Sequence, residues 1–292
     1  MFFTIESEEL SVKINLIGLE INSIRSKETG QEYLWQGDPQ FWKGQAPVLF
    51  PIIGALKEGK TNFKGEEYAL PKHGFVRNSS LGKMVKQESD LLLFRIESNS
   101  ETLRMYPFEF IFEITFQVKG KSLHVRHQVF NTGKGEMYYS LGGHPAFNCP
   151  IYPEEKLEDY SIAFPEIEND QTWLITSDGL IGGPGETMLD NSNKISLHKH
   201  IFDQDALILK NLKSRTATLS HKTKGALLEL TFDDFDYLGI WAKPGAPFVC
   251  LEPWLGIADS SEHSGKLKEK EGIRRLESGS SESKSYSINI LR

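Results

Sequence analysis

The sequence predicts an all-β protein, a large antiparallel sandwich with few short helices. Several segments of the 292-residue chain alternate apolar and polar residues with a period of two and are rich in β-branched and aromatic residues. This pattern is typical of half-buried strands. Glycine and proline turn signals separate the segments, and helical periodicity is scarce. Many short strands with few helices indicate an antiparallel sandwich or barrel.

Five segments carry the clearest strand pattern. They are 91–98, 108–118, 122–130, 226–232 and 285–291. Residues 153–159 and 264–271 are each expected to form one or two helical turns. The polar segment 277–285 precedes a clean alternating strand, so we expect a long hairpin turn there rather than a linker. Because no internal repeat and no dividing linker appear, a single domain is expected over residues 1–292.

Composition excludes several classes of protein. The net charge of −7 and the pI near 5.7 provide no positive field for a polyanion, so no nucleic-acid partner is expected. No apolar run is long enough to span a membrane, and the start MFFTIESEEL lacks the features of a secretory signal, so we expect a cytoplasmic protein. Cys149 and Cys250 are too few for a disulfide framework and lack zinc-binding CxxC spacing.

Most of the eight histidines are expected to be structural. His124 and His127 lie three apart in a strand pattern and therefore point to opposite faces. His198 and His200 could share a face, but no third ligand lies at useful spacing, so a zinc site is not expected. Two further histidines in polar surroundings are expected at the surface: His221 and His263.

His144 stands in the unusual stretch SLGGHPAFNCP (140–150). Gly142 and Gly143 remove side chains from the approach to the imidazole, and the proline that follows holds His144 extended. Asn148 adds an amide that binds hydroxyls or fixes a loop. Histidine titrates near neutral pH and can donate or accept a proton, so these residues fit either a proton carrier or a satisfied core histidine.

His73 lies in ALPKHGFVRNSS, followed by Gly74, Phe75 and Arg77. Glycine lets a backbone approach a ligand, aromatic faces stack on sugar rings, and arginine offers a fork of donors to oxygen. The alternative is a turn between strands in which His73 bonds to the main chain.

Glu252 is the sole charge in the apolar stretch PFVCLEPWLGIAD (247–259). Burial there would raise the pKa of its carboxyl toward the range of a general base. The alternative is a salt-bridged strand end, because Pro253 cannot donate to a ladder. Asp203 and Asp205 stand at the mouth of another apolar strand, where a carboxylate can accept hydrogen bonds from sugar hydroxyls. The aspartates of 233–236 lack the spacing of a calcium loop.

In this order, the stretches resemble the aldose 1-epimerase (galactose mutarotase) family, most closely its branch associated with lactose and hexose operons. The matching elements are EYLWQGDPQFW with APVLFPIIG (32–54), LPKHGFVRNS (70–79), YPFEF (106–110), SLGGHPAFNCP (140–150), DALILKNL (205–212), LGIWAKPGAPFVCLEPWLGIAD (238–259) and EGIRRL. Each match alone is weak, whereas the ordered set is specific.

The resemblance implies a β-supersandwich that interconverts the α and β anomers of an aldose. It implies that Glu252 is the general base at the anomeric hydroxyl and His144 the general acid at the ring oxygen. His73 corresponds to a second histidine near the ring oxygen, and Asp205 to an acidic residue that holds ring hydroxyls. Arg77, Asn148 and Trp254 complete the expected substrate-binding set. A carboxylate and a histidine suffice for this chemistry, so neither a cofactor nor a metal is expected.

Two departures from the family pattern concern the substrate. Ala55 stands where sugar-binding members commonly carry an arginine, which Lys57 or Arg77 could replace, and Trp254 stands where galactose-type members usually carry glutamine. A non-catalytic carbohydrate-binding protein, a sugar-phosphate mutarotase and a glycoside hydrolase or lyase are the alternatives, although a hydrolase would require two carboxylates. We expect a small-molecule sugar partner and a monomer or weak homodimer.

Overall fold

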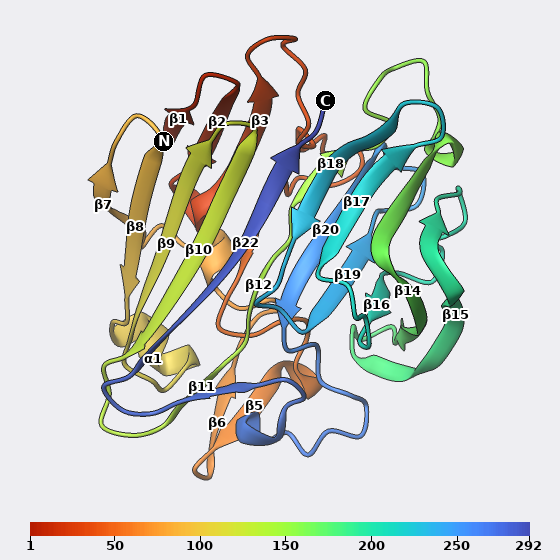
Figure 1. The fold of residues 1–292 in the computed structure, drawn as a ribbon. Helices are drawn as coiled ribbons and strands as arrows, with labels where there is room; N and C mark the ends of the chain where they lie inside the picture. Colours follow the sequence, from red (N-terminus) through yellow and green to blue (C-terminus); the bar gives the residue numbers. More distant parts are fainter.

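The computed structural model describes residues 1–292 and consists mainly of strands (Figure 1). A nine-stranded antiparallel sheet has the order β15-β14-β17-β18-β22-β10-β9-β8-β7. Its strands are β7 (Lys83–Gln87), β8 (Leu91–Glu97), β9 (Phe110–Lys119), β10 (Ser122–Asn131), β14 (Tyr160–Ile175), β15 (Ile181–Ser196), β17 (Thr216–His221), β18 (Gly225–Thr231) and β22 (Ser281–Ile290). The C-terminal strand β22 runs between β10 and β18 and joins the two halves of the sheet (Figure 1).

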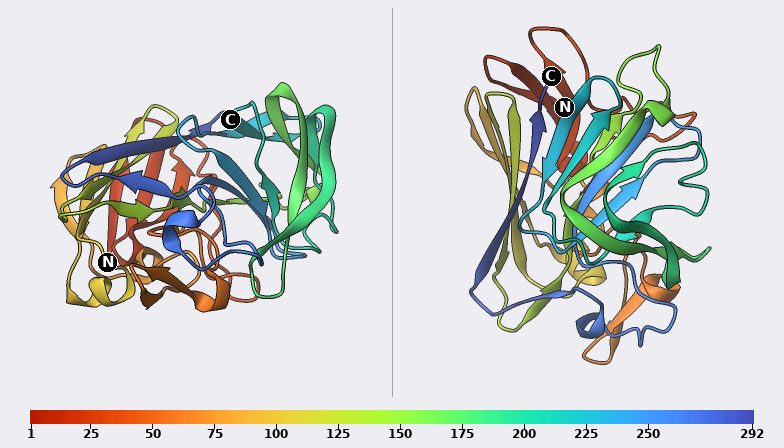
Figure 2. Two further views of the ribbon diagram at one scale, coloured as in Figure 1. Left: turned by 90° about the horizontal axis from the view of Figure 1, so that it is seen from below. Right: turned by 45° about the vertical axis from the view of Figure 1, so that its right-hand side comes forward.

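A second sheet has the order β16-β19-β20-β12-β4, with β13 also paired to β20. Its strands are β4 (Val48–Leu49), β12 (Leu141–Gly143), β13 (Ala146–Asn148), β16 (Leu207–Leu209), β19 (Tyr237–Trp241) and β20 (Phe248–Leu255). Smaller sheets comprise β1 (Phe2–Glu6), β2 (Leu10–Asn15) and β3 (Glu20–Ser26), then β5 (Lys60–Phe63) with β6 (Glu66–Ala69), and β11 (Met137–Tyr139) with β21 (Arg274–Leu276). Figure 2 shows β14 and β15, in green, at the end of the large sheet away from the yellow strands.

The two large sheets pack face to face through aromatic residues. Phe50, just after β4, stacks on Phe112 of β9 with ring centroids 4.4 Å apart. Gly143 of β12 lies directly over β22, because a Cβ added to it would approach the Tyr286 hydroxyl to 2.8 Å. The β1–β3 sheet joins the same core, where Phe3 contacts Phe94 of β8. Side chains of both large sheets therefore form one core, as in other sandwiches.

Burial along the strands explains why the sequence pattern predicts the fold. In β10, buried and accessible residues alternate along the strand, so the period-two pattern follows from one buried face. In β20 every residue from Phe248 to Leu255 is buried. A strand covered on both faces reads as a continuous apolar run, and Glu252 is the exception within it.

The five predicted strands are confirmed, with shifts of a few residues at their ends. They correspond to β8, β9, β10, β18 and β22. The predicted helical segments contain only the single 3-10 turns Leu157–Asp159 and Leu267–Glu269. The one α-helix, α1 (Ser100–Met105), was not predicted; Asn99 caps it by accepting from the Glu101 and Thr102 N–H groups, as is typical of an N-cap.

The expected hairpin turn at 277–285 is wrong. β22 already begins at Ser281, and it pairs with β10 and β18, whereas the preceding β21 pairs with β11. The segment therefore connects two different sheets, which local polarity cannot reveal. No helix in the structure has the length and apolar character needed to cross a bilayer.

Truncation of Phe112 tests the face-to-face packing. We expect Phe112→Ala to lower the free energy of unfolding by about 3–5 kcal/mol, because it removes a fully buried ring that Phe50 stacks on. The matched control is Phe2→Ala, since Phe2 is 63% exposed, and it should change stability by less than about 0.5 kcal/mol. Urea unfolding measures both; equal midpoints would contradict the packing described.

Candidate active site

The strand pairing of the second sheet places His144 opposite Glu252. β20 is continuous, but its partner on one side is split: β13 pairs with residues 248–250 and β12 with 254–255. Glu252 lies in the stretch between these two pairings, and His144 lies in the gap between β12 and β13. One backbone bond spans the gap, from the Leu251 N–H to the Pro145 carbonyl at 3.1 Å.

Pro253 belongs to the same stretch of β20. The sequence allowed a strand end at this proline, but β20 continues to Leu255 and has β19 as its neighbour along Tyr237–Trp241. Pro253 and Pro145 both lie in the stretch where the pairing with β12 and β13 is interrupted, and neither has an N–H to donate to the ladder there. The strand-end alternative for Glu252 is therefore wrong, and its carboxyl lies in the interior.

Glu252 and His144 are in direct contact. His144 Nε2 lies 3.2 Å from Glu252 Oε2, and both side chains are almost fully buried. Neither Glu252 Oε2 nor His144 Nδ1 has a hydrogen-bond partner in the protein. Trp42 stacks on the His144 ring with centroids 5.0 Å apart, and Trp241 meets it edge-on at 5.8 Å. Because buried polar groups are usually satisfied, these two atoms without hydrogen bonds set the pair apart from an ordinary structural contact.

Burial moves the two pKa values apart. Desolvation, followed by the positive charge of Arg77, lowers the pKa of His144 to about 3. Desolvation also raises the pKa of Glu252 well above its usual range, and the positive charge of Lys72 opposes this shift. Both effects disfavour charged forms. Burial therefore favours a neutral imidazole on His144 and disfavours the ionised carboxylate of Glu252.

His73 adjoins this pair and is held by the main chain. Its ring lies edge-on to His144 with centroids 5.8 Å apart, and its Nδ1 accepts the Gly54 N–H at 3.2 Å. A neutral ring with Nδ1 as acceptor carries its proton on Nε2. Burial lowers the pKa of His73 well below its usual value. His73 thus presents a neutral N–H donor.

A cavity of about 230 Å³ encloses these groups. Its lining combines titratable side chains with three tryptophans and small residues. It comprises Trp42, Ile53, Gly54, Lys72, His73, Arg77, His144, Ile175, Gly179, Ile181, Asp205, Ala206, Ile208, Trp241, Glu252, Trp254 and Ala258. Polar groups among aromatic faces are typical of a small-ligand site, and tryptophan faces can stack on a sugar ring.

Two polar residues of this cavity have strained backbones. His73 and Asp205 have φ angles of 67° and 75°, in the left-handed region that costs non-glycine residues roughly 1–2 kcal/mol. Asp205 Oδ1 accepts the Ala206 N–H at 2.8 Å, which leaves its second oxygen available. Such strain is frequent at functional sites.

Most of the predicted site residues meet in this cavity. Glu252, His144, His73, Asp205, Arg77 and Trp254 all line it. Asn148 does not: its amide donates to the Glu32 carbonyl at 2.9 Å, which corresponds to the loop-fixing alternative. Sequence reasoning assigned no role to Trp42, Trp241 and Lys72, although Trp42 lies within the matching stretch 32–54.

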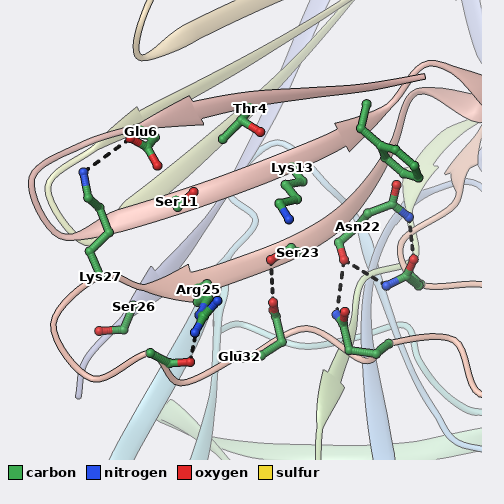
Figure 3. Close-up of a pocket in the computed structure, with 14 residues that line it drawn as sticks. Thr4, Glu6, Ser11, Lys13, Asn22, Ser23, Arg25, Ser26, Lys27 and Glu32 are labelled. Carbon is green, nitrogen blue, oxygen red and sulfur yellow. Dashed lines mark hydrogen bonds and ion pairs between the residues drawn. The ribbon is translucent and has the colours of Figure 1, made fainter.

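A larger hollow of about 990 Å³ lies over β1–β3 (Figure 3). Its lining is polar, but many of those groups bond to one another: Ser23 with Glu32, Lys27 with Glu6 at 3.4 Å, and Arg25 Nε to the Gly30 carbonyl at 2.9 Å. Because these groups satisfy each other and lack a buried acid–base pair, we place the candidate active site in the smaller cavity.

The remaining histidines differ partly from expectation. His124 is exposed and His127 buried, so their predicted opposite orientation is confirmed. His221 and His263 were expected at the surface, but their side chains are only 6% and 8% exposed. They lie 3.5 Å from Glu155 and 3.2 Å from Asp259, respectively. Glu155 is far along the chain from His221 and leaves no local sequence signal, whereas Asp259 is only four residues from His263.

Two groups of residues are candidate metal ligands. His198 and His200 are both exposed and belong to no ligand cluster. His144, Cys250 and Glu252 have potential ligand atoms within 4.8 Å of one another. Burial raises the pKa of the Cys250 thiol well above its usual value, which opposes the thiolate that a metal would require.

A buried ion pair supports one wall of the cavity. Lys270 Nζ donates to Asp259 Oδ1 at 3.0 Å, and both side chains are fully buried. Asp259 also bonds through its backbone to Ala55 and Ile181, and its Oδ2 accepts the Lys57 N–H at 3.0 Å. Asp259 thereby ties together three segments that border the site.

Comparisons with known proteins agree with the fold. The family model described as aldose 1-epimerase matches residues 1–266. The chain is 35% identical to the plasmid-encoded protein LacX of Lactococcus lactis subsp. lactis, over 100% of both proteins. The structure of a galactose mutarotase related enzyme from Lactobacillus acidophilus is 31% identical, with a TM-score of 0.93 over 100% of this chain and 98% of that one. A galactose mutarotase-like protein from Lactobacillus casei is 26% identical, with a TM-score of 0.91 over 99% and 100%.

The sandwich and its cavity define a protein of the galactose mutarotase-like class. With a family match over most of its length and a relative 35% identical end to end, the chain belongs to the aldose 1-epimerase family. Its expected fold class is thereby confirmed, and it is an enzyme of the carbohydrate isomerase type.

Removal of Lys270 tests the buried ion pair. We expect Lys270→Met to lower the free energy of unfolding by about 3–5 kcal/mol, because it leaves the buried carboxylate of Asp259 without its counter-charge. Lys268→Met is the matched control, since Lys268 is exposed and forms no ion pair. Urea midpoints that fall equally in both variants, or in neither, would contradict the supporting role.

Proposed function

We propose that the protein interconverts the α and β anomers of a hexose or related aldose by acid–base opening of the sugar ring. The observation that carries the proposal is the 3.2 Å contact between His144 Nε2 and Glu252 Oε2, two groups that can exchange protons with one bound sugar. The family membership of the chain supports the same reaction.

Ring opening requires one base and one acid at neighbouring oxygens. Ionised Glu252 takes the proton from the anomeric hydroxyl, and the electrons of that O–H bond form the C1 carbonyl. The C1–O5 bond breaks, and protonated His144 delivers its proton to O5. Rotation about C1–C2 and reclosure with the roles reversed give the other anomer, so no proton is gained or lost over the cycle.

The protonation of the empty pocket fits the open-chain stage of this cycle. Burial favours protonated Glu252 and neutral His144, which is the form of the pair after ring opening. The ring-opening form has the same number of protons, with the proton on His144 instead. The short contact between the two side chains allows this shift.

The other cavity residues are assigned to substrate binding. His73 donates from Nε2 to a sugar oxygen near the ring oxygen, and Asp205 accepts ring hydroxyls through its free carboxylate oxygen. Trp42, Trp241 and Trp254 offer apolar faces to the ring. These roles require no cofactor.

A non-catalytic carbohydrate-binding protein is the second candidate. Ala55 favours it, because this position lacks the guanidinium group common in sugar-binding relatives, and the site would then bind sugar without turnover. The two functions share a pocket and differ only in turnover.

Substitution of the pair separates these functions. We expect Glu252→Gln and His144→Asn each to slow anomer exchange by roughly 10²- to 10⁴-fold, because each removes one proton-transfer group, while sugar still binds. Exchange NMR or polarimetry on free and phosphorylated aldoses measures the rate, and calorimetry measures binding.

Glu28→Gln and His124→Asn are matched controls at exposed positions, and they should retain the wild-type rate. If the wild-type protein binds sugar but equilibrates no aldose faster than buffer does, the binding protein is correct. Release of reducing ends from an oligosaccharide would favour a hydrolase instead.

A further inference from the structure

Two positive charges in the active-site cavity lack counter-charges. Lys72 and Arg77 both line the cavity, yet neither side chain forms an ion pair or a hydrogen bond in the protein. Elsewhere the chain pairs comparable groups, as in Arg95 with Glu113 at 2.6 Å. Arg77 is half-buried and Lys72 is exposed at the cavity. A partly buried guanidinium group without a partner is costly unless a ligand satisfies it.

No acidic group near the cavity pairs with these two cations. Asp205 and Glu252 line the cavity, but Glu252 contacts His144 instead, and burial disfavours its ionised form. Outside the cavity, Glu20 acts on Arg77, but its carboxylate accepts the Gln45 and Ala46 N–H groups at 2.7 and 2.9 Å. Lys72 and Arg77 are therefore left without a paired carboxylate.

The exposed ammonium group of Lys72 lies near two small residues, Ala55 and Gly179. A Cβ added to Gly179 would lie 3.5 Å from the Ala55 Cβ and 3.7 Å from Lys72 Nζ. Neither Ala55 nor Gly179 carries a group that could pair with the ammonium group. Lys57 was the other lysine that could replace a cation at position 55. Its Nζ donates to the His263 carbonyl at 3.3 Å, and it does not line the cavity.

Building on the proposed function, we propose that the substrate is an aldose with an anionic substituent, a phosphate or a carboxylate, and that Lys72 selects it. The substituent contacts the Lys72 ammonium, while Arg77 supplies the second positive charge of the cavity. The reacting end of the sugar lies at Glu252 and His144. A lysine at the opening acts as a point charge that receives such a group directly.

The experiment compares neutral and anionic forms of the same sugars. Anomer exchange is measured by NMR for glucose and galactose, their 6-phosphates, and glucuronate and galacturonate. We expect kcat/KM to be at least about tenfold higher for an anionic form than for its neutral parent, as one charged contact in a partly screened site allows. The phosphate and carboxylate arms show which anion fits.

Three variants locate the selectivity. Lys72→Met should lower the anionic-to-neutral ratio of kcat/KM about tenfold, mainly through KM, and Lys72→Arg should retain most of the ratio because it keeps the charge. Lys57→Met is the matched control and should leave the ratio within about twofold. Raising the salt concentration from about 50 to 500 mM should increase KM for the anionic sugars alone.

Each outcome bears on one claim. Equal kcat/KM for neutral and anionic sugars, or an unchanged ratio in Lys72→Met, overturns the inference and leaves the anomer-exchange function standing. Failure to equilibrate any of the six sugars contradicts the proposed function itself, and the inference falls with it.

Discussion

The pairing register of β20 is the constraint on which the site depends. β12 and β13 pair with β20 in one register, Gly142 with Trp254 and Ala146 with Cys250. The residue between them that falls opposite Glu252 is therefore His144. Because β12 ends at Gly143 and β13 begins at Ala146, His144 occupies the gap and meets Glu252 at 3.2 Å. The glycines serve the packing as well: Gly142 lies against Pro253 and Trp254, and Gly143 against Tyr286.

Burial of this pair then determines its chemistry. β20 and the segment that carries His144 are buried within the sandwich, so the interior disfavours charge on either group. It lowers the pKa of His144 and raises the pKa of Glu252. A proton on this pair is thus favoured on Glu252 over His144, and a reversible acid–base reaction requires two such groups with separated pKa values. Lys72 and Arg77 oppose the shift of Glu252, so the same charges that would hold a substrate also favour the ionised carboxylate.

The sequence predicted the fold class and six residues of the cavity, because both leave local signals. Alternating strands follow from one-sided burial, and Glu252 is conspicuous as the sole charge in a buried strand. Local sequence patterns do not reveal a side-chain contact whose partner lies far along the chain. Asn148 was expected to be available, but it bonds to Glu32, and His221 was expected at the surface, but it contacts Glu155. Likewise, only the fold brings Trp42 and Lys72 close to His144 and Glu252.

The most direct test of the shared proton is the pH dependence of kcat/KM for anomer exchange, which reports the number of protons on the pair rather than their position. The pair has no base below the pKa of His144, about 3, and no acid above the raised pKa of Glu252. The account therefore predicts no loss of kcat/KM as the pH falls from about 7 to about 5, and a loss only on the alkaline side. An acid limb near the ordinary histidine value of about 6.5 would contradict it.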